Sequence, residues 1–192
     1  WSAQELSTDE AVIGWNDATI KDFHHMTWSP ADVFIRALYS RIYFQITLAN
    51  EFIRESDASK VSDRGISGAD ATEIAYMHAE ARFLRALSYY HAMDLFGNVP
   101  FVTEDDNVGA FLPNQITRTN LFNYIESELK AIETELKDAR TNEYGRADKA
   151  AAWALLSRLY LNAQVYTGTA KSSECITYCN KITAIPGYAL IN

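Results

Sequence analysis

Apolar residues recur at alternating intervals of three and four from residue 70 onward, which predicts a long central helix. The first stripe on this helix consists of Ile74, Met77, Ala81, Leu84, Ser88, His91 and Leu95. A second stripe consists of Tyr76, Phe83, Leu87 and Tyr90. Two stripes predict packing neighbours on two sides. Asp70 and Glu73 have the spacing of a capping box, and Gly97 and Pro100 predict the end of the helix.

The same period predicts four further helices. The first begins at Pro30, ends near Glu55, and is followed by a polar connection over residues 56–68. Its stripe is Phe34, Leu38, Ile42, Ile46, Ala49 and Ile53. Another begins after Thr117 or Thr119 and is broken by Gly145. Its stripe is Leu121, Ile125, Leu129, Ile132 and Leu136. Two more helices are predicted, one opening near residue 147 and one over residues 173–184.

Two helices carry a similar sequence. Residues 37–43 read Ala-Leu-Tyr-Ser-Arg-Ile-Tyr and residues 154–160 read Ala-Leu-Leu-Ser-Arg-Leu-Tyr, with a weaker third copy at residues 86–90. Such wedge-shaped sequences are typical of stacked helix pairs. We therefore predict an all-α fold, a tetratricopeptide-like helical repeat stack with long irregular loops. The whole of 1–192 is expected to be a single domain, with a loop region at 1–30 and the helical stack at 31–192.

Amino-acid composition and net charge limit the functions that this protein can have. The 192 residues are 48% hydrophobic and 22% charged, as in an ordinary globular protein, and the formal net charge is −8. This acidic balance argues against a nucleic-acid partner. No apolar run approaches the roughly 20 residues that a membrane helix needs, and the first residues do not resemble a secretory leader. The two cysteines, Cys175 and Cys179, are expected to be small, partly buried free thiols.

The motifs do not favour an enzyme. The sequence has no nucleophile elbow, phosphate-binding glycine loop, HExxH motif or Cys/His constellation. His24 and His25 lack partners at a zinc-site spacing, and His78 and His91 are rotated by about 220° on one helix. We expect no metal and no cofactor. A glycosidase stays open, because its two carboxylates need only lie about 5 to 10 Å apart in space.

Several segments together resemble one known family. Residues 80–100 contain Glu-Ala-Arg-Phe-Leu-Arg-Ala-Leu, then Tyr-Tyr, then Asp-Leu-Phe-Gly-Asn-Val-Pro. Other segments match the same family in the same order along the chain. They are residues 5–11 with the regions of Trp15 and Trp28, the helix from Tyr43 to Asn50, and residues 145–162. This succession resembles the SusD/RagB family of outer-membrane glycan-binding lipoproteins.

The resemblance implies a non-enzymatic, surface-exposed lipoprotein of the cell outer membrane that captures oligosaccharide or polysaccharide for nutrient uptake. Its partner would be a TonB-dependent, SusC-like transporter. Because members of the family are much longer, we expect this chain to be a fragment, and the membrane contact would be an N-terminal lipid anchor that the chain does not contain. The alternative is a helical-repeat scaffold for protein–protein interaction.

A glycan site needs flat apolar rings beside polar groups. The loop region offers Trp15, Asn16, Asp17, His25 and Trp28. The alternative role for Trp15 and Trp28 is to pin this loop to the helices. A second candidate for the glycan site is the acidic segment 103–107. Its alternative interpretations are a solvated acidic loop and, less favoured, a calcium site.

Overall fold

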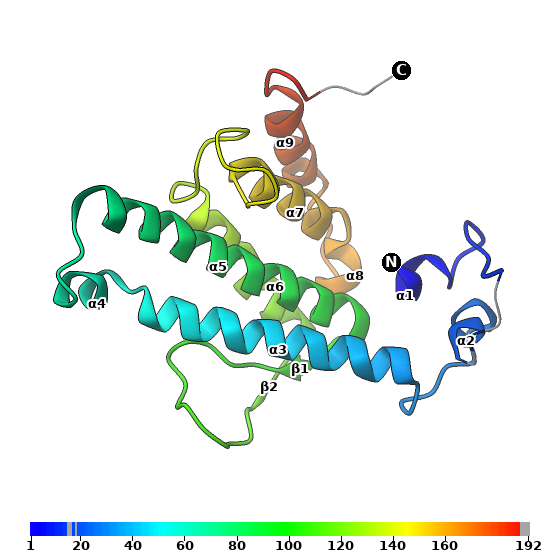
Figure 1. The fold of residues 1–192 in the computed structure, drawn as a ribbon. Helices are drawn as coiled ribbons and strands as arrows, with labels where there is room; N and C mark the ends of the chain where they lie inside the picture. Colours follow the sequence, from blue (N-terminus) through cyan, green and yellow to red (C-terminus); the bar gives the residue numbers. More distant parts are fainter. Residues whose placement is uncertain (15–16, 18, 189–192) are drawn as a thin grey trace. The chain divides into compact units, whose positions relative to one another are not determined.

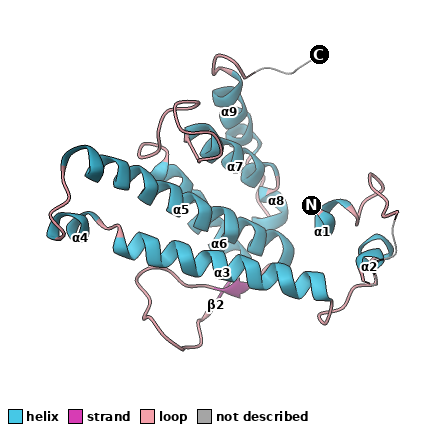
Figure 2. Ribbon diagram, in the orientation of Figure 1, coloured by secondary structure: helices cyan, strands magenta, loops and turns pink. Residues whose placement is uncertain are grey.

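The structure is a computed structural model that describes residues 1–14, 17 and 19–188. Helices dominate it, and the described strands form one short antiparallel pair (Figure 2). The chain separates into two compact units, Trp1–Phe44 and Gln45–Asn192. The single-domain organisation stays a prediction. In the described residues, no helix is both long and apolar enough to cross a bilayer.

The first unit holds two short helices within the predicted loop region. They are α1 (Ser2–Glu5) and α2 (Ile20–His25), and Leu6, Ile20 and Phe23 form a small buried core beside them. The long helix α3 (Val33–Glu55) starts in this unit and ends in the second. Asp32 caps α3, because its Oδ1 accepts the backbone N–H groups of Phe34 and Ile35 at 2.9 and 3.0 Å.

The second unit contains the remaining described elements (Figure 1). They are α4 (Ala58–Asp63), α5 (Gly68–Phe96), β1 (Val99–Pro100), β2 (Gln115–Ile116), α6 (Arg118–Ile132), α7 (Lys149–Leu161), α8 (Ala163–Thr167) and α9 (Ser172–Thr183). Helix α6 contacts both α5 and α7, and α9 packs along α7. All five predicted helices are confirmed as α3, α5, α6, α7 and α9. The short helices α4 and α8 and the strand pair were not predicted.

The observed helix ends can be compared with the capping and helix-ending residues predicted from the sequence. Gly97 follows α5 with φ +74°, and Thr117 caps α6 by accepting the Asn120 N–H at 3.2 Å, as predicted. The capping box at Asp70 is wrong, because α5 begins at Gly68 and Glu73 is bound by Lys137 and Arg146 from other segments. Helix α6 also ends at Ile132, well before Gly145.

Burial confirms some of the predicted stripes. The whole α6 stripe is buried, as is the α3 stripe from Ile42 onward. The first α5 stripe is wrong in part, because Met77 and Leu84 are 37% and 42% exposed. Several buried positions of α5 belong to neither stripe: Ala79, Arg85, Ala86, Tyr89, Ala92 and Met93.

The cysteine prediction is half right. Cys175 is partly buried and its thiol donates to the Ser157 carbonyl at 3.4 Å, whereas Cys179 is exposed. Burial raises the pKa of the Cys175 thiol. Both are free thiols in the structure, so the only departure from the prediction is the exposure of Cys179.

A buried arginine joins three elements of the second unit. The side chain of Arg85 on α5 is 2% exposed. It donates to Asn50 Oδ1 of α3 at 2.8 Å, to Glu128 Oε2 of α6 at 3.0 Å, and to the Glu104 carboxylate in the loop after β1. Burial alone would lower the pKa of Arg85, but the paired carboxylates hold it above its ordinary value. The guanidinium therefore stays charged and bound.

Neighbouring side chains fix the same loop through its backbone. The Tyr89 hydroxyl donates to the Val102 carbonyl at 2.7 Å and accepts the Val102 N–H at 2.9 Å. Arg54 Nε donates to the Glu104 carbonyl at 2.9 Å. The loop after β1 is consequently bound to both α3 and α5.

The Arg85→Ala substitution should reduce the free energy of unfolding by about 3–5 kcal/mol, because it leaves Glu128 and Glu104 without their buried partner. Chemical denaturation measures this loss. Arg158→Ala is the control, since this arginine is exposed and lies over the Tyr90 ring at 5.9 Å, so its loss should cost about 1 kcal/mol or less. Equal costs for the two variants would contradict the role given to Arg85.

Acid should destabilise the second unit through the same carboxylates. Burial raises the pKa of Glu128, but hydrogen bonds from Arg82 and Arg85 outweigh it and hold the pKa below its usual range. The stability that this carboxylate contributes is therefore present above the unfolded pKa of about 4.3 and is lost as the pH falls through the lower folded pKa. The denaturation midpoint should drop between about pH 5 and pH 3.

Two variants separate this effect from general acid denaturation. Glu128→Gln should be less stable than wild type near neutral pH and should lose less stability on acidification, because its amide does not titrate. The exposed Glu174→Gln should keep the wild-type profile. An unchanged acid slope in Glu128→Gln would show that the buried carboxylate does not carry the effect.

Candidate functional site

Two of the predicted glycan-binding residues, His25 and Trp28, lie close together in the sequence at the end of α2. His25 is the last residue of that helix and Trp28 follows three positions later, and both are exposed. Asp17 is also exposed and lies ahead of α2. Among the described residues, no hydrogen bond or ring contact joins Asp17 to His25 or Trp28. Trp15 and Asn16 lie outside the described residues.

A closed turn positions Trp28. Met26 ends α2 in the left-handed region at φ +54°, and the Thr27 N–H donates to the Asp22 carbonyl at 2.9 Å. The Thr27 hydroxyl donates to Asp22 Oδ1 at 3.3 Å. A non-glycine residue at positive φ is held there only by its surroundings. The turn is therefore fixed by hydrogen bonds on both sides of Met26.

The Trp28 ring lies between the small core and solvent. Its centroid is 6.2 Å from that of buried Phe23, with the ring planes 34° apart, and the residue is 44% exposed. The Phe23 contact is what an anchoring tryptophan would make. The exposed part is what a stacking platform for a sugar ring would need, with the His25 imidazole nearby in the sequence to offer a hydrogen bond.

The second candidate, residues 103–107, is a structural loop. The carboxylate of Glu104 binds Arg85, and Asp106 Oδ2 accepts the Thr103 N–H at 2.8 Å. Burial raises the pKa of Glu104, but the hydrogen bond and charge of Arg85 lower it by more than burial raises it. The net shift of this pKa is downward. The interpretation of this segment as a solvated acidic loop is wrong for Glu104. Within the described residues, no group of three or more His, Cys, Asp and Glu side chains is arranged to hold a metal ion.

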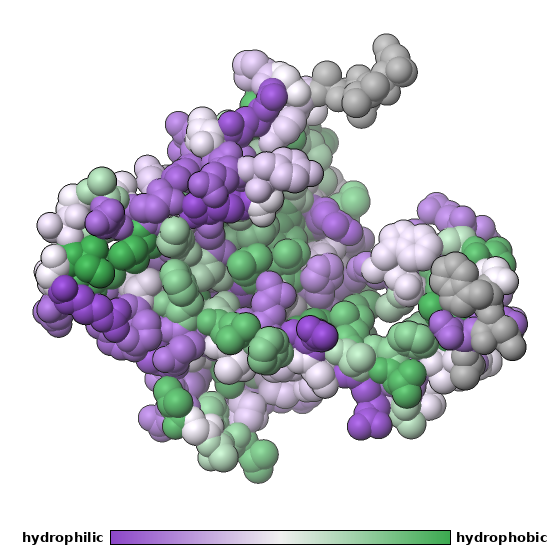
Figure 3. Space-filling view, viewed as in Figure 1, coloured by the Kyte–Doolittle hydropathy of each residue, from purple (hydrophilic) through white to green (hydrophobic). Residues whose placement is uncertain are grey.

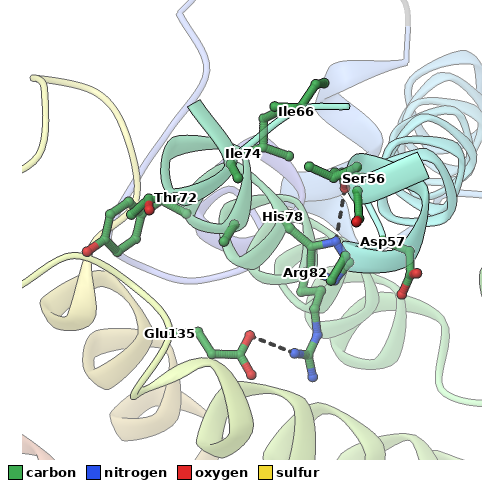
Figure 4. Close-up of a pocket in the computed structure, with 14 residues that line it drawn as sticks. Ser56, Asp57, Ile66, Thr72, Ile74, His78, Arg82 and Glu135 are labelled. Atoms are coloured by element: carbon green, nitrogen blue, oxygen red, sulfur yellow. Dashed lines mark hydrogen bonds and ion pairs between the residues drawn. The ribbon is translucent and has the colours of Figure 1, made fainter. Parts of the chain in front are cut away.

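A concave site of about 590 Å³ lies beside α4 and α5 (Figure 4). His78 Nδ1 and Ser56 Oγ are 2.9 Å apart, and Arg82 donates to Glu135 at 2.9 Å. Ile66 and Ile74 supply apolar surface. Because these polar groups are bound to one another, the hollow offers a ligand mainly apolar contact. His78 thus has a structural partner on another segment.

An apolar groove of about 480 Å³ runs where α3 and α5 lie side by side. The exposed Leu48 and Phe52 of α3 face it together with Met77 and Leu84 of α5. Apolar side chains gather on the visible face over these helices in Figure 3. The sequence signalled this groove only indirectly, through Leu48 and Phe52, which are apolar residues outside the buried stripe of α3.

Comparison with known proteins identifies the family to which this chain belongs. A family model described as "Starch-binding associating with outer membrane", the SusD-like type, matches residues 3–161. The starch-binding protein SusD of Bacteroides thetaiotaomicron is 36% identical over 183 residues, which cover 95% of this chain and 31% of that protein. The chain thus spans about a third of the length of this relative.

Solved structures share the fold. A laminarin-binding SusD-like protein matches with a TM-score of 0.75 and 25% identity, over 97% of this chain and 39% of the other. A structure determined with a xylogluco-oligosaccharide matches with a TM-score of 0.77 and 19% identity, over 99% of this chain and 38% of the other. The predicted helical, SusD-like fold class is confirmed, with one short strand pair added to it. With a family model that covers most of its length, this chain belongs to the SusD-like family of carbohydrate-binding, outer-membrane-associated proteins.

Proposed function

We propose that this protein binds oligosaccharide or polysaccharide at the cell surface for nutrient uptake. Membership of the SusD-like family is the observation that carries the proposal. Two structural relatives, one named for laminarin and one solved with a xylogluco-oligosaccharide, support carbohydrate as the ligand class. In this chain, the partly exposed Trp28 on its closed turn is the side chain best suited to stack on a sugar ring.

The proposal assigns a binding role without catalysis. The residues that we expect to contact the glycan are Trp15, Asn16, Asp17, His25 and Trp28. The full-length protein would be a lipid-anchored component of the outer membrane that works with a TonB-dependent, SusC-like transporter. Family membership and the outer-membrane description of the matched model support this localisation.

A helical-repeat interaction scaffold is the second candidate function. The apolar groove between α3 and α5 favours it, because Leu48, Phe52 and Leu84 expose side chains that a partner protein could cover. The complete gene separates the two functions. A signal peptide that ends in a lipidated cysteine, with a TonB-dependent transporter encoded beside it, is expected for glycan uptake. A cytosolic start with no such neighbour would favour the scaffold.

The Trp28→Ala substitution should lower glycan affinity about tenfold, which corresponds to about 1.4 kcal/mol, because it removes the stacking surface. The melting temperature should stay close to that of wild type, since much of the ring is exposed. Affinity gel electrophoresis against starch, laminarin and xyloglucan measures binding, and thermal denaturation measures stability.

Two controls distinguish a platform from an anchor. Phe44→Ala removes another exposed aromatic ring from the same unit and should leave glycan binding unchanged. Phe23→Ala removes the buried partner and should lower the melting temperature. If Trp28→Ala resembles Phe23→Ala, with a large loss of stability, the indole is an anchor and the platform role is wrong.

A further inference from the structure

A second aromatic surface lies on the other compact unit, in the segment between α6 and α7. Tyr144 is fully exposed there, on the rim of a concave site of about 670 Å³. This volume is within the range of roughly 300–1,000 Å³ that is usual for small-ligand sites. Sequence analysis missed the site, because no helical or motif signal marks Tyr144. An exposed aromatic ring at the edge of a hollow is a candidate for ligand contact.

The loop that carries Tyr144 is held by hydrogen bonds along its length. The Lys149 N–H donates to the Lys137 carbonyl at 3.1 Å, which closes the loop at its base. Inside it, Asn142 Nδ2 donates to the Ala147 carbonyl at 2.8 Å, and the Arg146 N–H donates to the Glu143 carbonyl at 3.1 Å. Tyr144 is therefore presented on a fixed turn, and little ordering is needed when a ligand binds.

Backbone geometry at one side of this loop is unusual. Arg140 has φ +65°, and Asp148 Oδ2 stabilises it by accepting the Arg140 N–H at 2.8 Å. Among the described residues, Met26 beside Trp28 is the other non-glycine residue at positive φ. Strained residues of this kind cluster at binding sites. The same backbone feature thus adjoins both aromatic surfaces.

Small apolar side chains and a second tyrosine also line the hollow. Ala151 and Ala154 line it from α7, where small side chains leave room for a ligand. Tyr188 also lines it and is 40% exposed. The Arg140 guanidinium lies 5.6 Å from the Tyr188 ring centroid and donates to the Pro186 carbonyl at 2.7 Å. Two tyrosines and a shallow apolar floor suit the ring faces of a pyranose.

The charges of the lining favour a neutral ligand. Arg146 is bound by Glu73 and Glu80, and Arg140 is engaged by Pro186 and Tyr188. Both arginines of the described lining therefore already have protein partners, so neither is held ready for an anion. The exposed carboxylate of Glu143 accepts hydrogen bonds from hydroxyl groups, and the tyrosine hydroxyls both donate and accept them.

We propose that the hollow beneath Tyr144 is a second carbohydrate-binding subsite, which takes a pyranose unit of a neutral oligosaccharide. The proposal rests on the glycan-binding function proposed above. Tyr144 stacks on the sugar ring, Ala151 and Ala154 form the floor, and Glu143 accepts hydroxyl hydrogen bonds.

The test uses the full-length gene product in affinity gels that contain starch, laminarin or xyloglucan. Tyr144→Ala should weaken retention by the bound polysaccharide about threefold to tenfold, because it removes the stacking ring. Ala154→Arg should weaken it similarly, because the long side chain fills the hollow from an exposed helix position that folding does not depend on. Tyr144→Phe should bind more strongly than Tyr144→Ala and more weakly than wild type, since it keeps the stacking ring and loses the hydroxyl. Leu112→Ala, which trims another fully exposed side chain, should also bind like wild type.

Each outcome separates this subsite from the proposed function. Unchanged retention in Tyr144→Ala, or in Ala154→Arg, with normal binding by wild type overturns the subsite and leaves the function intact. Absence of binding by wild type to every polysaccharide tested overturns both. If Tyr144→Ala keeps its glycan binding but loses co-purification of the membrane transporter, the surface is a protein interface and the subsite proposal is wrong. Melting temperatures of all four variants should match wild type, and a loss in Tyr144→Ala alone would assign the ring a structural role.

Discussion

The charge of Arg85 constrains the arrangement of the second unit. A buried guanidinium that loses its acceptors is costly, so all of its partners must be in place together. Asn50, Glu104 and Glu128 come from α3, from the loop after β1 and from α6, and none of these segments is adjacent in the sequence. The pairing therefore sets the positions of two helices and a loop at once, whereas apolar packing alone would tolerate small shifts.

This constraint also decides which loop is free to bind a ligand. The acidic segment after β1 is the obvious candidate by composition, but Arg85 binds the Glu104 side chain and Arg54 binds the Glu104 carbonyl. Tyr89 binds the backbone of Val102, just before this segment. The carboxylates of Glu104 and Asp106 are therefore already bound within the protein. The turn after α2 and the loop before α7 instead satisfy their backbones locally and leave Trp28 and Tyr144 exposed. Ring surface directed outward is what sugar binding needs.

Local signals in the sequence were sufficient for most of the helices. The α6 stripe, the Thr117 cap and Gly97 each depend on residues within one or two turns, and the structure confirms them. Glu73 was misread as part of a capping box because its true partners, Lys137 and Arg146, lie 64 and 73 positions away. The burial of Arg85 was not predicted for the same reason, since helix periodicity contains no information on distant acceptors. The five residues proposed to bind glycan remain a prediction.

The two aromatic surfaces share a backbone feature that the hydrophobic periodicity of the sequence cannot predict. Trp28 follows Met26 and Tyr144 follows Arg140, and these two are the non-glycine residues at positive φ in the described chain. Each such residue costs about 1 kcal/mol or more relative to an ordinary conformation. Hydrogen bonds from Thr27 to Asp22 and from Arg140 to Asp148 offset that cost. Because such conformations persist only where the surroundings enforce them, these local hydrogen bonds are what hold the two segments from which the exposed rings project.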